Sequence, residues 1–403
     1  MFYNPEFIIM KNNIISKKGN LSFEIPYQIY DLIKNNELSN IENLYTEIFN
    51  YLEKNNIIIK GDGNYNPFII NNDQHNNLRL FIQLTKNCNL SCLHCFQGSE
   101  KLSNPIIKFN DLKDIINEAI EKGIYKIDFT GGEISTLNYI EELFEFLNNK
   151  PICSNIFTNL AFNNKKIINS IINCKSISTV ITSVDYFRKS KHDYFRGAKG
   201  AYERTINNIK ILRDNNIDVI VNTMILKDNR NEILDIIRYF NNMGVNVQLD
   251  TLVLRGNAIK NEKQISSDNN EEKFIYEILK QENLINEKFK YSMTKVGCGI
   301  GKNLIFLDNN LKYQLCPGLT DDLDSFFFMG KTLTSAINKL KNVNIQCKVK
   351  NCEYINDCSY GCREKSLFEN GNIYSRDNTF CSLREKIGDL YEKENRISDT
   401  KTN

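Results

Sequence analysis

The sequence predicts an α/β protein in which an incomplete (β/α)6 barrel lies between a small N-terminal module and a cysteine-rich C-terminal region. Two observations predict this. Strand-like and helix-like segments alternate from about residue 78 to 285, and such alternation builds a parallel sheet with right-handed crossovers. Seven of the twelve cysteines then fall after residue 297 of the 403-residue chain. The alternation by itself also fits an open doubly wound sheet.

Six apolar runs are the candidate strands of the central unit, which we expect to span residues 76–288. They are LFIQL (80–84), YKIDF (125–129), CSNIF (153–157), SISTVITSV (176–184), DVIVNTMIL (218–226) and NVQLDTLV (246–253). Amphipathic helical patterns such as FNDLKDIINEAIEKG lie between them. In a barrel, chemistry gathers at the carboxyl ends of the strands, and the motifs described below follow those ends. Their placement favours the barrel.

Residues 1–75 have the pattern of a separate module. Short β-type runs within FIIMKNNIISKKGNLSFEI are broken by a Lys-Lys-Gly-Asn turn. Two helical stretches follow, YQIYDLIKNN and IENLYTEIFNYLEKNN, and the second carries Leu44, Ile48 and Leu52 on one face. The turn-rich segment GDGNYNP, residues 61–67, predicts a linker to the barrel.

Charge and hydropathy exclude several classes of partner. The net charge is +2 and no block of like charges is long enough to act as a tail, so we expect no nucleic-acid partner. No apolar run approaches the ~20 residues needed to cross a bilayer, so we expect no membrane association. The start of the chain lacks a signal-peptide pattern, and we therefore expect a cytoplasmic protein.

Cysteines in a reducing compartment are better explained as metal ligands than as disulfides. Cys153 and Cys174 stand apart from the others, and we expect them to be small buried apolar residues. Cys88, Cys92 and Cys95 directly follow the first candidate strand.

A structural zinc site has four ligands, so three thiols without a fourth nearby indicate an iron–sulfur cluster with one iron left open. A zinc site completed from elsewhere, by His94 or by a C-terminal cysteine, is the alternative.

A second landmark, IDFTGGEIS at residues 127–135, follows the second candidate strand. Gly131 and Gly132 would let the backbone come close to a ligand, and Glu133 offers a carboxylate that suits an ammonium group. Taken alone, the two glycines fit a plain turn equally well.

The CxxxCxxC motif after the first strand and the TGGE motif after the second resemble the radical S-adenosylmethionine (SAM) superfamily. The resemblance implies a TIM-like partial barrel in which Cys88, Cys92 and Cys95 hold a 4Fe–4S cluster whose open iron binds SAM. It also implies SAM contacts from other residues: His94 against the adenine, and Gly131, Gly132 and Glu133 at the methionyl ammonium. The proline usual after GGE is replaced by Ile134, which removes no ligand.

Further matches to this family are FTN (157–159), TSVD (182–185), HDYFRG (192–197) and VNTMI (221–225). They make Asn159, Ser183 and Arg196 candidates for the ribose and carboxylate of SAM. In this family the reduced cluster donates one electron to SAM, which splits into methionine and a 5′-deoxyadenosyl radical that abstracts hydrogen. The cofactors carry this chemistry, so no catalytic side chain is implied. The resemblance does imply an electron donor such as ferredoxin or flavodoxin.

The later cysteines resemble the SPASM (twitch-type) extension of radical SAM enzymes that act on peptides and proteins. It would occupy residues 289–403 and hold one or two auxiliary 4Fe–4S clusters. The family's crossed pattern gives two ligand sets: Cys298, Cys316 and Cys362 in the first, and Cys347, Cys352, Cys358 and Cys381 in the second. Four residues separate the first pair of the run where two are usual, and the glycine expected before Cys316 is absent. The first set, with three cysteines, has an open iron or a non-cysteine ligand.

Residues 1–75 resemble the winged-helix domain that recognises leader peptides in peptide-maturing enzymes. This implies a ribosomally made precursor peptide as the substrate and a thioether between a Cys sulfur and a carbon atom as the product, as in sactipeptides. One alternative is formylglycine formation as in anaerobic sulfatase maturases, against which Pro317 stands where those enzymes carry Asp. Another is a non-catalytic iron–sulfur or zinc protein that binds peptides or acts as a redox partner.

Overall fold

The structure is a computed structural model. It describes residues 2–4, 6–11, 13–18, 22–35, 37–59, 68–70, 74–98, 105–266, 270–282, 284, 297–356 and 358–387.

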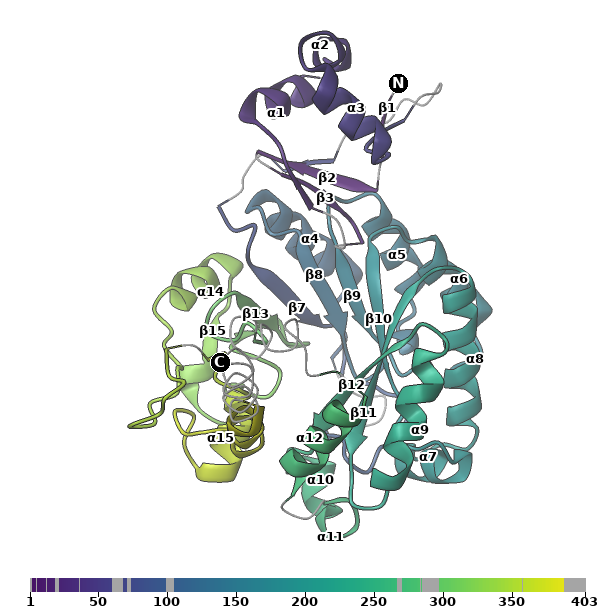
Figure 1. Ribbon diagram of the computed structural model, residues 1–403, viewed down its shortest axis with the longest axis vertical. Coiled ribbons are helices and arrows are strands. Elements are labelled where there is room, and N and C mark those ends of the chain that lie inside the picture. The colour runs from purple at the N-terminus through teal and green to yellow at the C-terminus, as the bar shows by residue number, and fades with distance from the viewer. Residues whose placement is uncertain are drawn as a thin grey trace, which may run out of the picture.

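A nine-stranded sheet forms the body of the protein, in the order β12-β11-β10-β9-β8-β7-β13-β14-β15 (Figure 1). Its first six members are parallel to one another. They are β7 (Arg79–Gln83), β8 (Lys126–Thr130), β9 (Ser154–Phe157), β10 (Ile177–Ser183), β11 (Asp218–Ile225) and β12 (Asn246–Thr251). Neighbours in this part of the sheet are also neighbours in the chain, without the reversal of strand order that defines a doubly wound sheet. The structure therefore confirms the α/β fold with six βα strands in barrel order.

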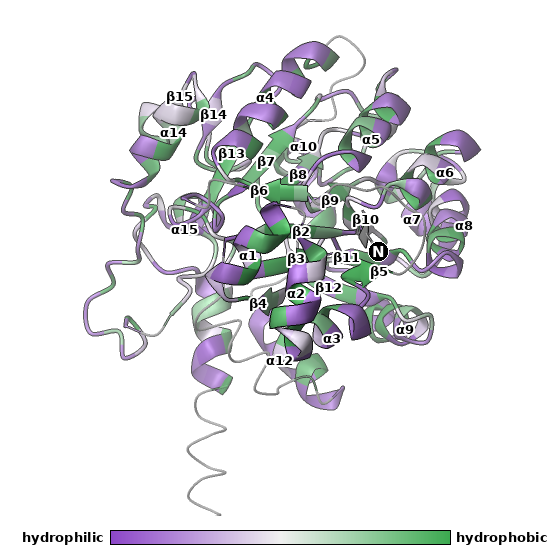
Figure 2. Ribbon diagram, turned by 90° about the horizontal axis from the view of Figure 1, so that it is seen from above, coloured by the Kyte–Doolittle hydropathy of each residue, from purple (hydrophilic) through white to green (hydrophobic). Residues whose placement is uncertain are grey.

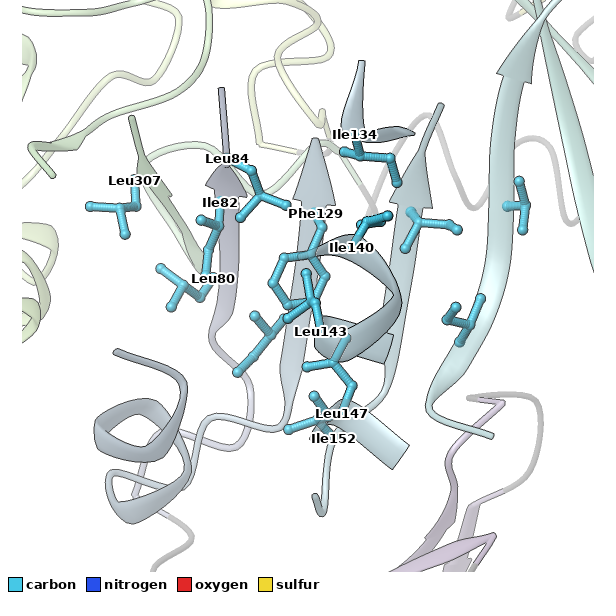
Figure 3. Packing of buried hydrophobic residues seen from close by; sticks show 14 of the residues in the cluster. Leu80, Ile82, Leu84, Phe129, Ile134, Ile140, Leu143, Leu147, Ile152 and Leu307 are labelled. Atoms are coloured by element: carbon cyan, nitrogen blue, oxygen red, sulfur yellow. The ribbon is translucent and has the colours of Figure 1, made fainter. Parts of the chain in front are cut away.

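Helices cover the outer face of these strands (Figures 1 and 2). They are α4 (Phe109–Glu121), α5 (Ile140–Asn148), α6 (Lys165–Asn173), α7 (Lys189–Arg196), α8 (Ala201–Asp214) and α9 (Arg230–Asn241). All of these helices except α7 bury apolar residues at helical spacing, and Figure 3 shows Leu143 and Leu147 of α5 on the side of the helix that faces Phe129 of β8. The short helices α10 (Asn257–Lys260), α11 (Glu262–Ile265) and α12 (Glu271–Gln281) follow β12.

The N-terminal module packs on the amino ends of the barrel strands. Its elements are β1 (Phe2–Tyr3), β2 (Phe7–Met10), β3 (Asn13–Ser16), β4 (Ser22–Glu24), α1 (Tyr27–Lys34), α2 (Leu38–Leu44), α3 (Thr46–Lys54), β5 (Ile58–Ile59) and β6 (Phe68–Ile70). They make a four-stranded sheet, β4-β3-β2-β6, and a two-stranded one, β1-β5. Ile8 and Met10 pack around Tyr125, just before β8, and the buried Lys17 donates a hydrogen bond to the Asn148 carbonyl (3.1 Å).

The single long helix expected near residues 41–56 is instead two helices, α2 and α3, and this expectation was wrong. Tyr45 lies between them with φ −137° and ψ 51°, outside the helical region. The break turns Leu44 toward solvent, 70% exposed, while Leu52 on α3 is fully buried. The expected linker at 61–67 lies outside the described residues.

The C-terminal region continues the barrel sheet. β13 (Leu304–Leu307) pairs in parallel with β7, and β14 (Tyr313–Gln314) and β15 (Phe328–Gly330) extend the sheet in antiparallel fashion. Helices α14 (Leu333–Leu340) and α15 (Arg363–Asn370) complete the C-terminal region. The structure also describes two single turns of 3-10 helix, η1 (Ile134–Thr136) before α5 and η2 (Ser325–Phe327) before β15. Ile305, Leu307 and Leu315 belong to the main apolar core. This part of the region therefore folds on apolar contacts.

None of the helices that the structure describes is long and apolar enough to cross a membrane.

Candidate active site

The three clustered cysteines lie on the loop after β7, at the carboxyl end of the barrel. The backbone N–H of Ser91 donates to the Arg196 carbonyl (3.1 Å), and that of Leu93 donates to the Phe195 carbonyl (2.9 Å), so the end of α7 fixes the loop. A cavity of about 170 Å³ opens beside it. It is lined by Lys86, Cys88, Leu90, Cys92, His94, Cys95, Phe96, Gln97, Gly131, Gly132, Asn159 and Arg196. The strand-end motifs named from the sequence therefore meet at one place.

The environment of the thiols disfavours bare thiolates. Burial raises the pKa of Cys88 to about 12, and the negative charges of Glu133, Cys92 and Cys95 add to the rise. Burial also raises the pKa of Cys92, and the nearby Arg196 opposes this rise. Metal ligation requires deprotonated thiols. Three thiols beside one cavity, in a setting that penalises their negative charge, fit a positively charged iron–sulfur centre.

The glycine pair holds its loop against the cysteine loop. Gly132 N–H donates to the Thr85 carbonyl and Glu133 N–H to the Asn87 carbonyl, both at 2.8 Å. A Cβ atom at Gly132 would collide with the carbonyl oxygens of Lys86 and Asn87. Glycine is thus required here by close packing of two backbones, one of which carries the cysteines.

The Glu133 carboxylate does not line the cavity. It is fully buried and accepts hydrogen bonds from Ser135 N–H (3.0 Å), Thr158 Oγ1 (2.6 Å) and Asn159 N–H (2.7 Å). Burial raises its pKa, and these donors oppose the rise. Glu133 thereby joins the loops after β8 and β9. Its contact with the methionyl ammonium stays a prediction.

His94 forms part of the cavity wall and stacks on Phe195, with ring centroids 4.7 Å apart and planes 2° from parallel. Burial lowers the pKa of His94 to about 4, so its ring is neutral at pH 7. Its Nδ1 is buried and has no hydrogen-bond partner among the described residues. A neutral flat ring held face to face with Phe195 fits the predicted role beside adenine, which stays a prediction.

The remaining SAM candidates have different surroundings. Asn159 lines the cavity, and its side-chain amide donates to Asn89 Oδ1 (2.8 Å). Arg196 lines it too, but its Nη2 forms an ion pair with Asp185 Oδ2 at 2.5 Å, and both side chains are buried. Ser183, at the end of β10, is not among the lining residues.

Asp185 was part of the quoted TSVD motif but received no role from the sequence. It accepts hydrogen bonds from Arg196 Nε (2.7 Å) and from the backbone N–H of Met224 (3.1 Å). Burial by itself would raise the pKa of Asp185, but the Arg196 charge together with His94, His192 and the Met224 N–H outweighs it and holds the pKa below its usual range. Arg196 Nη1 in turn lies 3.9 Å from Cys92 Sγ. The pair therefore positions a charged group beside one of the three thiols.

The structure brings four of the seven later cysteines to one cavity, and the two ligand sets stay a prediction. Cys347, Cys352, Cys358 and Cys381 all line one cavity of about 420 Å³. Burial raises the pKa of Cys316, and the charges of Glu364, Cys362 and Cys298 add to the rise. Among the described residues, no group of three or more His, Cys, Asp and Glu meets the geometry of a metal-ion site. The fit to clusters rests on the thiol sets themselves.

Comparison with known proteins identifies the central unit. Residues 82–240, which include the three-cysteine loop and strands β8 to β11, match the radical SAM superfamily. This chain contains a radical SAM domain. The recognition made from CxxxCxxC and TGGE is thereby confirmed for this part of the chain.

Two curated relatives of the radical SAM domain come from Bacillus subtilis. The antilisterial bacteriocin subtilosin biosynthesis protein AlbA is 28% identical over 167 residues, 41% of this chain and 37% of AlbA. The sporulation killing factor maturation protein SkfB is 29% identical over 165 residues, 40% of this chain and 39% of SkfB. The matched part therefore spans about two fifths of the length of these relatives.

Two solved structures share the fold over most of the chain. SuiB of Streptococcus suis, bound to S-adenosylmethionine, superposes with a TM-score of 0.61 at 14% identity and covers 95% of this chain and 100% of SuiB. The protein anSMEcpe, with bound AdoMet, gives a TM-score of 0.60 at 15% identity and covers 80% of this chain and 99% of its own.

Replacing Gly132 by alanine should disrupt the cysteine loop. The new methyl group meets two backbone carbonyls, so we expect a loss of about 1–3 kcal/mol in the free energy of unfolding and a clear loss of iron after anaerobic reconstitution. Gly371→Ala is the control, because open space surrounds it and only its positive φ of 67° carries a cost. Equal iron content in the two variants would contradict the idea that close packing at Gly132 holds the cysteine loop in place.

Asp185→Asn should be strongly destabilising. The change leaves the Arg196 charge buried without its counter-ion, and such losses amount to about 3–5 kcal/mol of unfolding free energy in urea titrations. Glu203→Gln breaks the exposed pair with Lys189 and should leave the urea midpoint unchanged. If the midpoints of the two variants are alike, the Asp185–Arg196 pair has no special structural role.

Proposed function

We propose that this protein is a radical SAM enzyme that modifies a ribosomally made precursor peptide and forms a thioether between a cysteine sulfur and a carbon atom. The meeting of Cys88, Cys92 and Cys95 with the Gly131–Gly132 turn in one cavity carries this proposal. A 4Fe–4S cluster held there would supply SAM with the electron that releases a hydrogen-abstracting radical. The chain's own residues would bind the cofactor, orient the substrate and exclude water.

A second cavity, of about 430 Å³, offers room for a substrate next to the first. The two cavities share Lys86, Phe96 and Gln97. On its other side the second cavity is lined by Pro317 and Thr320, from the loop that follows Cys316. A substrate in this chamber would lie between the SAM cavity and the first set of C-terminal cysteines. That position supports the use of an auxiliary SPASM-type cluster to receive a peptide thiolate or an electron.

The chamber wall is polar and carries both signs of charge. Asp308, Asp321 and Asp322 line it together with Arg255 and Lys312. Peptide backbone presents a donor and an acceptor at nearly every residue, and a polar wall can satisfy them. The relatives point the same way: AlbA and SkfB are named for the biosynthesis of a bacteriocin and the maturation of a killing factor, and SuiB has been solved with its precursor peptide SuiA.

The N-terminal module supplies an edge strand for a leader peptide. In the β4-β3-β2-β6 sheet, β4 lies at an edge. The Lys17 N–H donates to the Glu6 carbonyl, which makes Glu6 and Lys17 a hydrogen-bonded pair. Because such pairs alternate with non-hydrogen-bonded pairs along β2 and β3, the backbone N–H and C=O groups of Ile14 point toward β4, where Ile14 pairs with Phe23. The N–H groups of Ser22 and Glu24 therefore point away from the sheet. An extended peptide can add to such an edge as a further strand.

The module sits at the end of the barrel opposite the cysteine loop, and this separation sets a minimum length for the peptide substrate. An eight-residue strand such as β11 spans about 26 Å. A peptide bound at β4 must therefore include at least about eight extended residues before the modified position. An electron donor such as ferredoxin or flavodoxin and a cytoplasmic location complete the proposal.

Anaerobically reconstituted and reduced protein should cleave SAM to 5′-deoxyadenosine, measured by chromatography. Cys88→Ala should abolish the product because it removes one of three cluster ligands. Cys153→Ala is the matched control and should retain activity, since Cys153 lies just before β9 at the opposite end of the barrel. Iron-loaded protein that yields no 5′-deoxyadenosine would favour a non-catalytic iron–sulfur protein.

Glu24→Pro should weaken precursor binding about five- to tenfold, as expected for one lost backbone hydrogen bond. Calorimetry or fluorescence anisotropy with a cysteine-containing precursor peptide measures the dissociation constant. Glu24→Ala keeps the N–H group and should bind like the parent protein. Equal dissociation constants for the two variants would rule out strand addition at β4. The substitution tests the edge strand alone, whereas deletion of residues 1–75 would also expose Tyr125.

A further inference from the structure

The first set of C-terminal cysteines is one ligand short of a complete 4Fe–4S site. Clusters of this type are held by four protein ligands, and Cys298, Cys316 and Cys362 supply three. Two cysteines of the chain remain outside the three sets, and both lie at the amino ends of barrel strands, Cys153 before β9 and Cys174 at the end of α6. The fourth ligand of this set is therefore not a cysteine of this chain.

A carboxylate lies beside the same thiols. Glu364 is in the first turn of α15, two residues after Cys362. Its carboxyl group packs directly on Gly318, two residues after Cys316, so that a Cβ atom at Gly318 would overlap the carboxyl atoms. Glu364 thus touches the Cys316 loop while its backbone adjoins Cys362.

Among the described residues, the Glu364 carboxylate has one loosely held cation partner, Arg255. Its Oε1 is buried and accepts no hydrogen bond there. The neighbouring cation is Arg255, whose Nη1 lies 3.8 Å away, beyond hydrogen-bond reach. That Nη1 instead donates to the Gly318 carbonyl (2.8 Å), and Nη2 pairs with Asp322 Oδ2 (3.3 Å). The Glu364 side chain is 17% exposed, but its buried Oε1 is left with a long ion pair only. A buried carboxylate oxygen is normally held by a close cation or by a metal.

We infer that Glu364 is the fourth ligand of the auxiliary cluster held by Cys298, Cys316 and Cys362. The inference rests on the proposed function, which places an auxiliary cluster at these cysteines. A carboxylate oxygen would occupy the iron that no thiolate holds, and carboxylates are established ligands of protein-bound iron. The cluster would then be closed to water in the resting protein, and a peptide thiolate would reach its iron only by displacing Glu364.

The test uses protein in which Cys88, Cys92 and Cys95 are all replaced by alanine, so that only the auxiliary sites remain. After anaerobic reconstitution with iron and sulfide, this background should bind about eight irons, two clusters of four. In ¹⁷O-labelled water, pulsed EPR of the reduced protein should show no oxygen coupling from water. Glu364→Gln in the same background should either gain that coupling or lose about four irons.

Three further variants sharpen the result. Glu364→Cys should restore about eight irons without water coupling, because thiolate is the usual ligand. Gly318→Ala, whose methyl group takes the place of the carboxyl group, should behave like Glu364→Gln. Glu369→Gln is the matched control on the same helix, where Glu369 pairs with Lys365 at 3.5 Å, and should match the background.

Two results separate the possible failures. If Glu364→Gln keeps about eight irons with no water coupling, the ligand assignment is wrong while the auxiliary clusters stand. Water coupling in the background itself would likewise overturn the assignment. If the background binds about four irons or fewer, the two auxiliary clusters of the proposed function are themselves contradicted.

Discussion

The close contact between the Gly132 backbone and the carbonyl groups of Lys86 and Asn87 is the constraint on which the candidate site depends. It fixes the distance between the loops after β7 and β8. The first loop supplies the three thiols, and the second supplies Gly131 and Gly132 of the cavity wall. Glu133 extends the connection to the loop after β9, and the Asp185–Arg196 pair extends it to α7. Consecutive parallel strands therefore deliver their loops to one rim, as barrel architecture requires.

The C-terminal region is attached to this rim by the sheet itself. β13 pairs in parallel with β7, and β14 pairs with β13, so the loop containing Cys316 follows a strand that lies one strand away from β7. The polar chamber between them is lined from both sides, by Lys86 and Gln97 on one and by Pro317 and Thr320 on the other. In the function proposed above, this geometry brings a substrate within reach of two iron–sulfur sites without any additional domain.

The sequence predicted the order of the six strands because each apolar run is short, bounded and followed by a helical pattern. It predicted the cavity residues because strand ends of a parallel sheet meet at one edge. It missed β13, since LIFL stands among loop-rich segments without a repeating pattern, and only pairing with β7 makes it a strand. It also missed the break at Tyr45, where backbone geometry overrides an apolar face that continues through Leu44.

Side-chain direction was beyond the reach of motif reasoning. Glu133 and Asn159 were both expected to face SAM, yet the Glu133 carboxylate is enclosed by three donors while Asn159 lines the cavity. Asp185 lies in the TSVD motif but received no role, and Glu364 lies in no motif, because the role of each depends on a partner that only the fold identifies. Asp185 pairs with Arg196, eleven residues on, and Glu364 packs on Gly318.

The central claim is that the loop of Cys88, Cys92 and Cys95 leaves one iron for SAM. The direct measurement is pulsed electron–nuclear double resonance on the reduced protein with SAM labelled by ¹⁵N at the amino group and ¹⁷O at the carboxylate. We expect hyperfine coupling from both labels, and we expect both couplings to disappear when Cys92 is replaced by alanine. Iron-loaded wild-type protein that binds SAM but shows neither coupling would contradict it.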